Sequence, residues 1–496
     1  MLKRFHWLII FIFFVSLVLR LNSITRVGET WDEFAVAGNG SEYIKLIAKK
    51  DFSRESWKLN YEHPPIAKYI FGASKIVPKV FPAIGELDSN FPPGREYLAG
   101  RVISALLGSI TVILTILLAN IYFGPRIAII SGLLLAFSPT AIAHNRINGL
   151  ETPLSLFLLA SFYCFVRFKK YRFILAGLLF GLACGTRFNA FLLAPLFPLV
   201  LYFERRMLDR KFFVELLTIF ASAGFIFTIL WPWLWSNPLS NLLESMKSSS
   251  IATQDEYFLG SLRKPPWYYY FPYFIATTPP LILLGFLRKA VLDIKSRAEL
   301  KPILWIGCIL TLTASLFPLK QDGIRYIFHL LPFICILASA GLYEVWNDLN
   351  QFLDPRLTNL LVLTVSVLSI WGVMATNPYQ LDYFNILVGG PRNVYNHKLF
   401  EINWWGEGIY EAVVWVNQNA PEGAGVNAAF IPLHVAPNFR SDLNYSAGTI
   451  DREYVITNTY AQWYQKLTID PNEYQPVYVV SSSGAPLVTV FQRNHQ

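Results

Sequence analysis

Long runs of apolar residues, separated by short segments rich in lysine and arginine, cover the first three quarters of the chain. Runs of this kind can cross ~30 Å of hydrocarbon as helices. The pattern therefore predicts a polytopic α-helical membrane protein with about eleven spans. The spans are expected at residues 6–23, 98–119, 127–143, 152–166, 173–186, 188–203, 213–234, 269–287, 302–318, 325–342 and 358–375.

The apolar stretch 173–203 decides the topology. Gly185-Thr186-Arg187 interrupts this stretch, which fits either one helix with a buried arginine or two short helices. Basic clusters at 167–172 and 205–211 flank it, and the positive-inside rule places both clusters in the cytoplasm. The chain must then cross the membrane twice between them. This parity predicts a multi-pass plasma-membrane protein with a cytoplasmic N-terminus and an external C-terminal domain.

The chain divides into two predicted parts, a membrane domain at 1–375 and a small external α/β domain at 376–496. After residue 376 the long apolar runs stop, and Asn, Pro, Gly and Tyr become frequent. The patterns predict one helix and several strands, of which the last two are joined by a Ser-Ser-Gly turn. The helix is expected at 408–419 and the strands at 425–431, 453–457, 476–481 and 486–492.

The first external loop, residues 24–97, is predicted to be structured. Apolar residues recur at helical spacing over 66–77, directly after Pro64 and Pro65, and more weakly over 33–49. Amphipathic helices of this kind lie at the membrane surface. They would hold the acidic residues of the loop near the headgroups.

Composition supports the membrane assignment. Of 496 residues, 54% are hydrophobic and 15% are charged, against about 25% charged in soluble domains. The net charge of +9 is explained by the basic loops, so we predict no nucleic-acid partner. All four cysteines lie inside apolar runs, which argues against an external disulfide framework.

The residues with candidate chemistry gather on the predicted external side of the membrane. Charged residues beside a span are costly and usually have a function. Two acidic segments stand out in the first loop, the pair Asp32-Glu33 in Trp31-Asp32-Glu33-Phe34 and the single acid Glu62 in Tyr61-Glu62-His63-Pro64-Pro65. The later external loops add further charged residues, which are Arg146, Glu151, Arg187, Lys247, Arg263, Lys264, Lys320 and Arg325.

These motifs, in this order, resemble the external loops of the GT-C membrane glycosyltransferases. The similarity is greatest to protein O-mannosyltransferases (glycosyltransferase family 39) and to lipid A aminoarabinose transferases. Asn148-Gly149-Leu150-Glu151 resembles the acidic element that opens the fourth helix in such proteins, although the acid there is commonly Asp. Arg187 stands where similar proteins usually have Lys. Further similar segments are Arg263 to Tyr269, Arg325-Tyr326, Tyr383 to Pro391 and Asn403-Trp404-Trp405-Gly406.

The resemblance implies an enzyme that transfers a sugar from a polyprenyl-phosphate donor to a hydroxyl group of a protein, lipid or glycan. Asp32 matches the leading acid of the family motif and is expected to be the general base. The predicted catalytic set is completed by Glu33, Glu62 and Glu151. The residues expected to contact the donor phosphate are His63, Arg187, Lys264, Arg325 and Tyr326.

Two other functions stay open at this point. An enzyme of the same architecture with a pyrophosphate-linked oligosaccharide donor would need a divalent cation, held by Asp32 and a second acid such as Glu151. A lipid or solute transporter would instead place polar residues near mid-membrane. Individual residues also have simpler explanations, since Lys264 suits interfacial anchoring and Glu151 suits a helix N-terminus.

Overall fold

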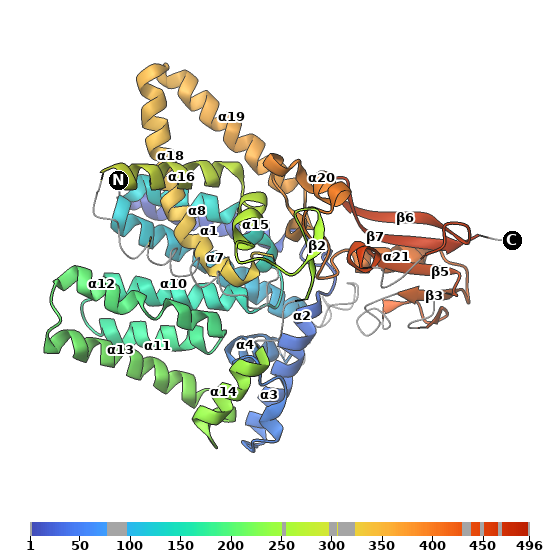
Figure 1. Ribbon diagram of the computed structural model, residues 1–496, viewed down its shortest axis with the longest axis horizontal. Coiled ribbons are helices and arrows are strands. Elements are labelled where there is room, and N and C mark those ends of the chain that lie inside the picture. Colours follow the sequence, from blue (N-terminus) through green and yellow to red (C-terminus); the bar gives the residue numbers. More distant parts are fainter. Residues whose placement is uncertain are drawn as a thin grey trace.

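The computed structural model describes residues 2–76, 97–249, 254–296, 305, 323–428, 438–446, 451–464 and 469–494. A body of helices occupies one end of the molecule and a small sheet domain the other (Figure 1). The N-terminus lies at the far end of the helical body, and the C-terminus at the tip of the sheet domain. The two predicted parts are thus visible, while the boundary at residue 375 stays a prediction.

Most helices of the body overlap the predicted spans, whereas α14 lies between two of them. Their bounds are α1 Leu2–Leu21, α7 Leu98–Phe123, α8 Pro125–Ala136, α9 Pro139–His144, α10 Glu151–Arg167, α11 Arg172–Cys184, α12 Leu196–Arg205, α13 Arg210–Ile229, α14 Pro238–Ser249, α15 Tyr270–Thr277, α16 Pro280–Ser296, α18 Leu331–Phe352 and α19 Pro355–Met374. The predicted span 302–318 lies outside the described residues, apart from Trp305.

Two predicted spans are each divided into two helices, and the first of them, residues 127–143, forms α8 and α9, separated at Phe137-Ser138. Residues 269–287 form two helices, α15 and α16, which are separated at Thr278-Pro279. A proline removes a backbone donor and pushes the residue before it out of the helical conformation. Two consecutive prolines, Pro279 and Pro280, therefore end one helix and begin the next.

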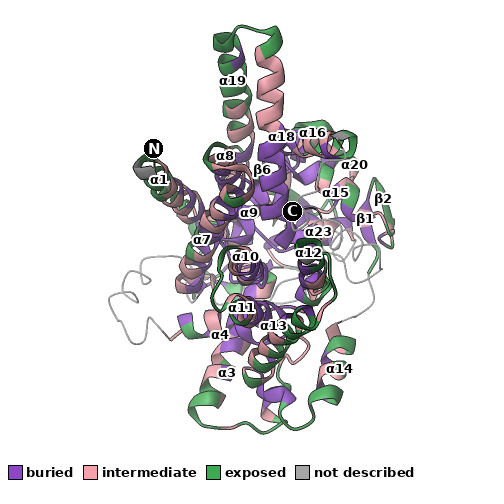
Figure 2. Ribbon diagram, turned by 90° about the vertical axis from the view of Figure 1, so that its left-hand side faces the viewer, coloured by how far each residue is buried: buried purple, intermediate pink, exposed green. Residues whose placement is uncertain are grey.

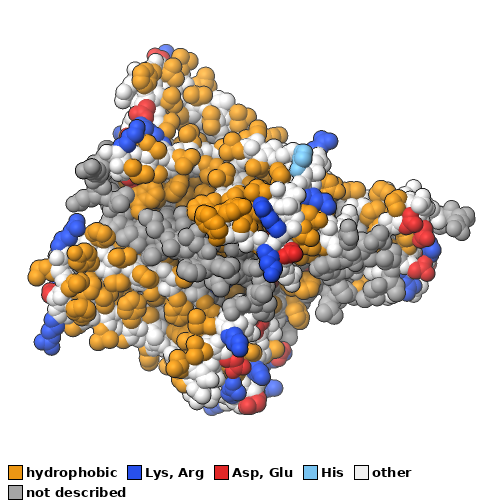
Figure 3. Space-filling model, viewed as in Figure 1, with side chains coloured by type: hydrophobic (Ala, Val, Ile, Leu, Met, Phe, Trp, Pro, Cys, Tyr) orange, Lys and Arg blue, Asp and Glu red, His pale blue; other side chains and the backbone are white. Residues whose placement is uncertain are grey.

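The surface of the body is suited to lipid. Five helices in the described part of the chain are long and apolar enough to cross a membrane, and shorter apolar helices accompany them. Only 11% of the apolar stretch in α19 is buried, against 83% in the stretch that contains α18. Figure 2 shows α19 as a largely exposed helix beside α18, of which the first half is buried and the second half is of intermediate burial, and Figure 3 shows hydrophobic side chains spread over the helical body. Apolar surface this large is unstable in water. The chain is an integral membrane protein.

The stretch 173–203 consists of two segments, as the charge pattern predicts. Helix α11 ends at Cys184, and the chain returns through the 3₁₀ helix η4 (Phe188–Leu193) and α12. Arg172, at the start of α11, pairs with Glu204, at the end of α12, with 2.9 Å between NH2 and Oε2. The two basic clusters therefore lie at the same end of the body, with Arg187 at the turn between the segments.

The first loop contains the predicted helices. The first stretch is α2 (Trp31–Glu33), a π-helix η1 (Phe34–Gly38) and α3 (Asn39–Ala48), and the second is α4 (Ile66–Ser74). Helices α3 and α4 cross at Gly40 and Gly72, where the two backbones approach closely. A methyl group on Gly72 would collide with the backbone of Gly40, so only glycine fits there. The first residue of α4 also donates a hydrogen bond to Gly185, at 2.9 Å from Ile66 N to Gly185 O. The loop is thus packed against the break at 185–187.

The C-terminal part has a five-stranded sheet in the order β4-β3-β5-β7-β6. The strands β4, β3 and β5 are parallel, and β7 is antiparallel to both β5 and β6. The predicted helix and strands are confirmed, whereas α20, α23, β4 and the hairpin of β1 and β2 were not predicted. The bounds are β1 Glu256–Phe258, β2 Ser261–Arg263, α20 Gly390–His397, α21 Ile409–Asn419, β3 Gly425–Ala428, β4 Asn444–Tyr445, β5 Tyr454–Asn458, α23 Thr459–Trp463, β6 Tyr474–Ser482 and β7 Ala485–Arg493.

Candidate functional site

Asp32 lies in α2, at the point where the chain leaves α1 and enters the first loop. The next residues form a π-helix, a local widening that is frequent at functional sites. The side chain of Asp32 accepts a hydrogen bond from NH2 of Arg325 and keeps 21% of its surface exposed. Asp32 is therefore both ion-paired and accessible.

Arg325 connects Asp32 to a second acid. Its Nε lies 2.6 Å from Oε1 of Glu151, and the same oxygen accepts from NH1 of Arg187. Glu151 is the first residue of α10, Arg187 follows α11, and Arg325 begins the 3₁₀ helix η6 (Arg325–Leu330). The four side chains form one continuous chain of ion pairs, which we call the ionic network: Asp32, Arg325, Glu151 and Arg187.

The ionic network is mostly buried and has no net formal charge. The side chain of Glu151 is 1% exposed, and the two arginines are 4% and 8% exposed. Of the two oxygens of Glu151, only Oε1 has a hydrogen-bond partner among the described residues. Ion pairs of this kind are strong where water is excluded, and removal of one member leaves a buried charge uncompensated.

Aromatic rings line the ionic network. The guanidinium of Arg187 lies 4.0 Å from the centre of the Tyr326 ring, and that of Arg325 lies 4.7 Å from the Trp405 ring. The ring of His144 lies 5.4 Å from Trp405, at the end of α9. Such contacts fix the planes of the two arginines. Trp405 brings the region that follows the last membrane helix into the same site.

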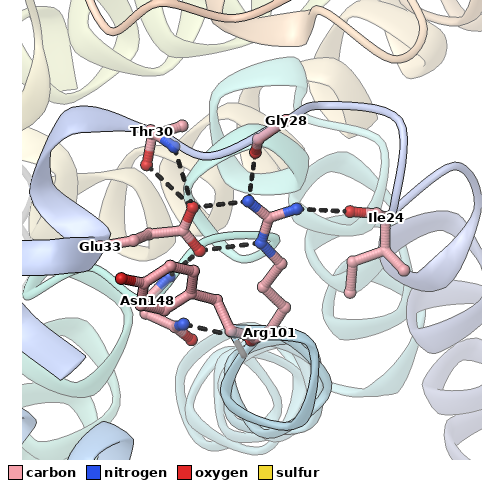
Figure 4. Close-up of polar contacts among 7 residues, drawn as sticks. Ile24, Gly28, Thr30, Glu33, Arg101 and Asn148 are labelled. Carbon is pink, nitrogen blue, oxygen red and sulfur yellow. Dashed lines mark hydrogen bonds and ion pairs between the residues drawn. The ribbon is translucent and has the colours of Figure 1, made fainter. Parts of the chain in front are cut away.

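Glu33 has a different environment from its neighbour Asp32. Its carboxylate is fully buried and accepts from Nε and NH2 of Arg101, at 2.8 and 2.6 Å, in a two-pronged ion pair. Thr30 and Asn148 add backbone N–H donors at 3.0 and 3.2 Å. Arg101 also donates to the carbonyl oxygens of Ile24 and Gly28 (Figure 4). Glu33 therefore fastens the start of the first loop to α7.

Glu62 and His63 form contacts within the first loop. Glu62 accepts from the Asn60 side chain, and the buried Nζ of Lys68 donates to the carbonyl oxygens of Asn60 and His63. Burial lowers the pKa of Lys68 to about 7, an effect that the nearby Glu62 opposes. The predicted roles of Glu62 in catalysis and of His63 in phosphate binding stay predictions.

The remaining predicted phosphate contacts divide between the ionic network and the surface. Tyr326 lies under Arg187, and its carbonyl oxygen accepts from the Asn189 side chain at 3.1 Å. Lys264 is exposed and directly follows β2, in a hairpin that pairs with the region near Phe400. Of the five predicted phosphate contacts, Arg187, Arg325 and Tyr326 are thus gathered together.

The open space beside the ionic network is small. A cavity of about 30 Å³ adjoins Arg325 and His144, which is room for about one water molecule. It is lined by Tyr273, Thr277, Glu401 and Trp404 among others. Within the described ranges, no group of three or more His, Cys, Asp and Glu side chains could hold a metal ion.

Sequence reasoning missed several residues that shape the site. Arg101 and His144 lie at helix positions where an apolar side chain would be ordinary, and both are buried. Arg146, a charged residue of the second predicted external loop, is also buried; it donates to the Asn377 and Gln380 side chains and so connects α9 to the region after α19. A charged residue within or beside an apolar span needs a partner. That rule, applied to every such residue, would also have identified Arg101.

Comparison with known proteins agrees with the predicted resemblance. Residues 7–240 match the family model described as dolichyl-phosphate-mannose-protein mannosyltransferase. Dolichyl-phosphate-mannose–protein mannosyltransferase 1 of Candida albicans is 28% identical over 198 residues, which are 37% of this chain and 21% of that protein. The protein of the same name from Saccharomyces cerevisiae is 28% identical over 148 residues, 28% of this chain and 16% of its own length. The chain thus spans about a fifth of the length of these relatives.

Solved structures decide the fold. ArnT from Cupriavidus metallidurans, bound to undecaprenyl phosphate, superimposes with a TM-score of 0.52 over 97% of both chains, at 14% identity. The archaeal oligosaccharyltransferase AglB from Archaeoglobus fulgidus, in complex with an inhibitory peptide and a dolichol-phosphate, gives 0.50 over 92% of this chain and 70% of that one, at 12% identity. The chain has the GT-C fold. In this GT-C fold the matched family region contains Asp32, Glu151 and Arg187, and Arg325 comes from outside it.

Mutation of Arg101 tests whether its ion pair with Glu33 fastens the first loop to α7. Arg101→Ala leaves the buried carboxylate of Glu33 without its counter-ion, so the free energy of unfolding should fall by ~3–5 kcal/mol. Thermal and denaturant unfolding of the purified protein in detergent measures this loss. The matched control is Arg172→Ala, whose pair with Glu204 is partly exposed and should be worth ~0–1 kcal/mol. Equal small losses in both variants would contradict the role of Glu33 in fastening the loop.

Proposed function

We propose that this protein is a glycosyltransferase that moves a sugar from a polyprenyl-phosphate donor to an acceptor hydroxyl group. The observation that carries the proposal is the ionic network, in which two acids and two arginines meet at one end of the membrane helices. The family match and the names of the relatives support a mannosyl group or a related hexose. The GT-C fold supports a lipid-linked donor, because the matched ArnT structure is bound to undecaprenyl phosphate.

Asp32 is the best candidate for the general base. An acceptor hydroxyl must come within hydrogen-bond distance of the carboxylate that deprotonates it. Asp32 is partly exposed, whereas Glu151 is buried beneath two arginines and Glu33 is held by Arg101. Asp32 is the member of this acidic group that a substrate can reach without unfolding the site.

The reaction balances with these groups. The acceptor hydroxyl gives its proton to the carboxylate of Asp32, and its oxygen forms a bond to the anomeric carbon of the sugar. The bond between that carbon and the phosphate oxygen breaks, and its electron pair leaves with the polyprenyl phosphate. Positive groups at the leaving phosphate stabilise the charge that develops there. Arg325 and Arg187 are placed to do so.

Donor binding requires an exchange of ion pairs. In the structure Arg325 is occupied by Asp32 and Glu151. A donor phosphate that takes the place of Asp32 on Arg325 would free the oxygen of Asp32 that must accept the proton. Glu151 would keep both arginines in position during this exchange, since it contacts each of them. Glu151 is thus a positioning residue in this proposal.

The external side of the membrane is the expected location of the site. The basic residues Lys169, Lys170, Arg206, Arg210 and Lys211 are exposed at the loops joining α10 to α11 and α12 to α13. The ionic network lies at the opposite ends of these helices, since Glu151 begins α10 and Arg187 follows α11. Basic loops favour the cytoplasm. The network, the first loop and the sheet domain would then face outward.

Asp32→Asn should abolish most transfer while donor binding survives. The amide keeps the shape of the carboxylate and removes the base, so turnover should fall by ~10²–10⁴-fold. Transfer from a synthetic lipid-phosphate sugar to an acceptor measures the loss, with donor affinity and thermal stability recorded in parallel. Asp51→Asn, at a partly exposed first-loop acid bonded to Ser53 and Ser56, is the control. Near-normal turnover in folded Asp32→Asn would remove the assignment, and a larger loss in Glu151→Gln would move the base there.

Arg187→Ala should weaken donor binding. A charge-assisted contact to phosphate is worth ~1.5–3 kcal/mol, which corresponds to roughly ten- to a hundredfold in affinity. Arg325→Ala should do the same, and Lys264→Ala tests the third predicted cation. Binding of a labelled polyprenyl-phosphate sugar measures each effect, with the exposed Arg126→Ala as the control. Donor affinities within about twofold of wild type for both Arg187→Ala and Arg325→Ala would leave a purely structural role for the ionic network.

Cysteine labelling tests the sidedness. Single cysteines at Ser53 in the first loop, Glu422 in the sheet domain and Lys169 in a basic loop would be placed in a background without Cys164, Cys184, Cys308 and Cys335. We expect an impermeant maleimide to label positions 53 and 422 on intact cells, and position 169 only after permeabilisation. Labelling of positions 53 and 422 from opposite sides would refute the topology.

A further inference from the structure

A second group of buried polar side chains lies outside the ionic network, where the chain passes from the membrane helices to the sheet domain. Asp382 ends the short 3₁₀ helix η7 (Gln380–Asp382) after α19, and Asn403 and Glu407 lie in the loop that leads to α21. All three are at least 98% buried. Two acids and one amide are thus enclosed in a region that the proposed reaction does not use.

Hydrogen bonds hold the three residues close together. The backbone N–H of Asn403 donates to Oδ1 of Asp382 at 2.7 Å. The side-chain amide nitrogen of Asn403 donates to the carbonyl oxygen of Glu407 and lies 3.4 Å from its Oε2. The two contacts to Glu407 assign the nitrogen of the Asn403 side-chain amide, and they therefore also assign its oxygen, Oδ1.

Each of the three side chains has an oxygen without a hydrogen-bond partner among the described residues. These oxygens are Oδ2 of Asp382, Oδ1 of Asn403 and Oε1 of Glu407. Neither acid forms a salt bridge within the part of the chain that the structure describes. Burial raises the pKa of Asp382 to about 7, and burial together with repulsion from Asp382 raises the pKa of Glu407.

Two buried acids without a counter-charge are unfavourable. A buried polar atom left unpaired costs about 1–3 kcal/mol, and more if it is charged. The group must therefore take up either protons or a cation. Three oxygen donors, two from carboxylates and one from an amide, are the ligand set of a hard divalent ion. The amide carbonyl is typical of Ca²⁺ sites, and the lack of nitrogen or sulfur donors in the trio disfavours zinc and copper.

We propose that Asp382, Asn403 and Glu407 bind a divalent metal ion, with Ca²⁺ as the favoured ion. The ion would stabilise the joint between the membrane helices and the sheet domain. The backbone carbonyl oxygen of Asn403 accepts a hydrogen bond from the side chain of Asn458 in β5 at 3.2 Å. The backbone carbonyl oxygen of Trp405, in the same loop, accepts from the backbone N–H of Trp31 at 3.3 Å. The site thus adjoins both the sheet and the segment that carries Asp32.

Terbium luminescence tests the site directly. Tb³⁺ occupies Ca²⁺ sites and emits when a nearby tryptophan is excited, and Trp405 is two residues from both Asn403 and Glu407. The full-length protein in detergent, first treated with a chelator, should show saturable Tb³⁺ emission that Ca²⁺ reverses. Asp382→Asn and Glu407→Gln should each weaken Ca²⁺ competition by at least about tenfold. Asp442→Asn, an acid paired with Arg440 in the same domain, should leave it unchanged.

Two controls separate this proposal from the proposed function and from protonation. Asp32→Asn should keep the Tb³⁺ signal even where transfer is lost, because the ionic network is a separate group. Ca²⁺ should also raise the melting temperature of the wild-type protein, which makes the test independent of how well the variants fold. The proposal fails if Ca²⁺ neither binds to the wild-type protein nor stabilises it. If chelated Asp382→Asn then also melts at a higher temperature than wild type, the two acids share a proton instead of binding a metal ion.

Discussion

Arg325 provides the connection on which the candidate site depends. Its guanidinium joins Asp32 of the first loop to Glu151 of α10, and Glu151 in turn holds Arg187. None of these charges is stable alone at the edge of a membrane, because the free energy of burying an isolated charge is large. The first loop, two membrane helices and η6 are therefore held in one arrangement by a requirement for neutrality.

The cost of burying polar and charged groups in lipid also allows the membrane helices to be predicted from the sequence. Apolar length and basic clusters were enough to place the described spans, because lipid leaves the backbone little choice but helices. The break at 185–187 followed from charge alone. Where the prediction was wrong, at 137–139 and at 278–280, prolines that begin a new helix had been read as part of one span. The sheet domain was predicted less completely, since β4, α20 and α23 are short and depend on contacts between residues far apart in the sequence.

The sequence predicted which charged residues belong to the candidate site, but it did not predict how these residues pair. The sequence pointed to Asp32, Glu151, Arg187 and Arg325, yet nothing in their spacing indicated that they pair with one another. Neighbouring residues also have different surroundings, since Glu33 is bound by Arg101 while Asp32 faces Arg325. Trp405 lies beside Arg325 and His144 only because the chain folds back after α19. Such long-range contacts leave no periodic signal, so sequence patterns cannot report them.

The crossing of α3 and α4 has a consequence for the reach between base and cation. Gly40 lies a few residues after Asp32 on the continuous stretch of α2, η1 and α3, and Gly72 belongs to α4, whose first residue is bonded to Gly185. The two glycines touch backbone to backbone. The segment that carries Asp32 is thus connected to the segment that carries Arg187 through a helix crossing made of backbone atoms alone. A methyl group added at either glycine would meet backbone atoms of the other helix and force the two helices apart, so the relative position of Asp32 and Arg187 depends on a contact that lies outside the ionic network.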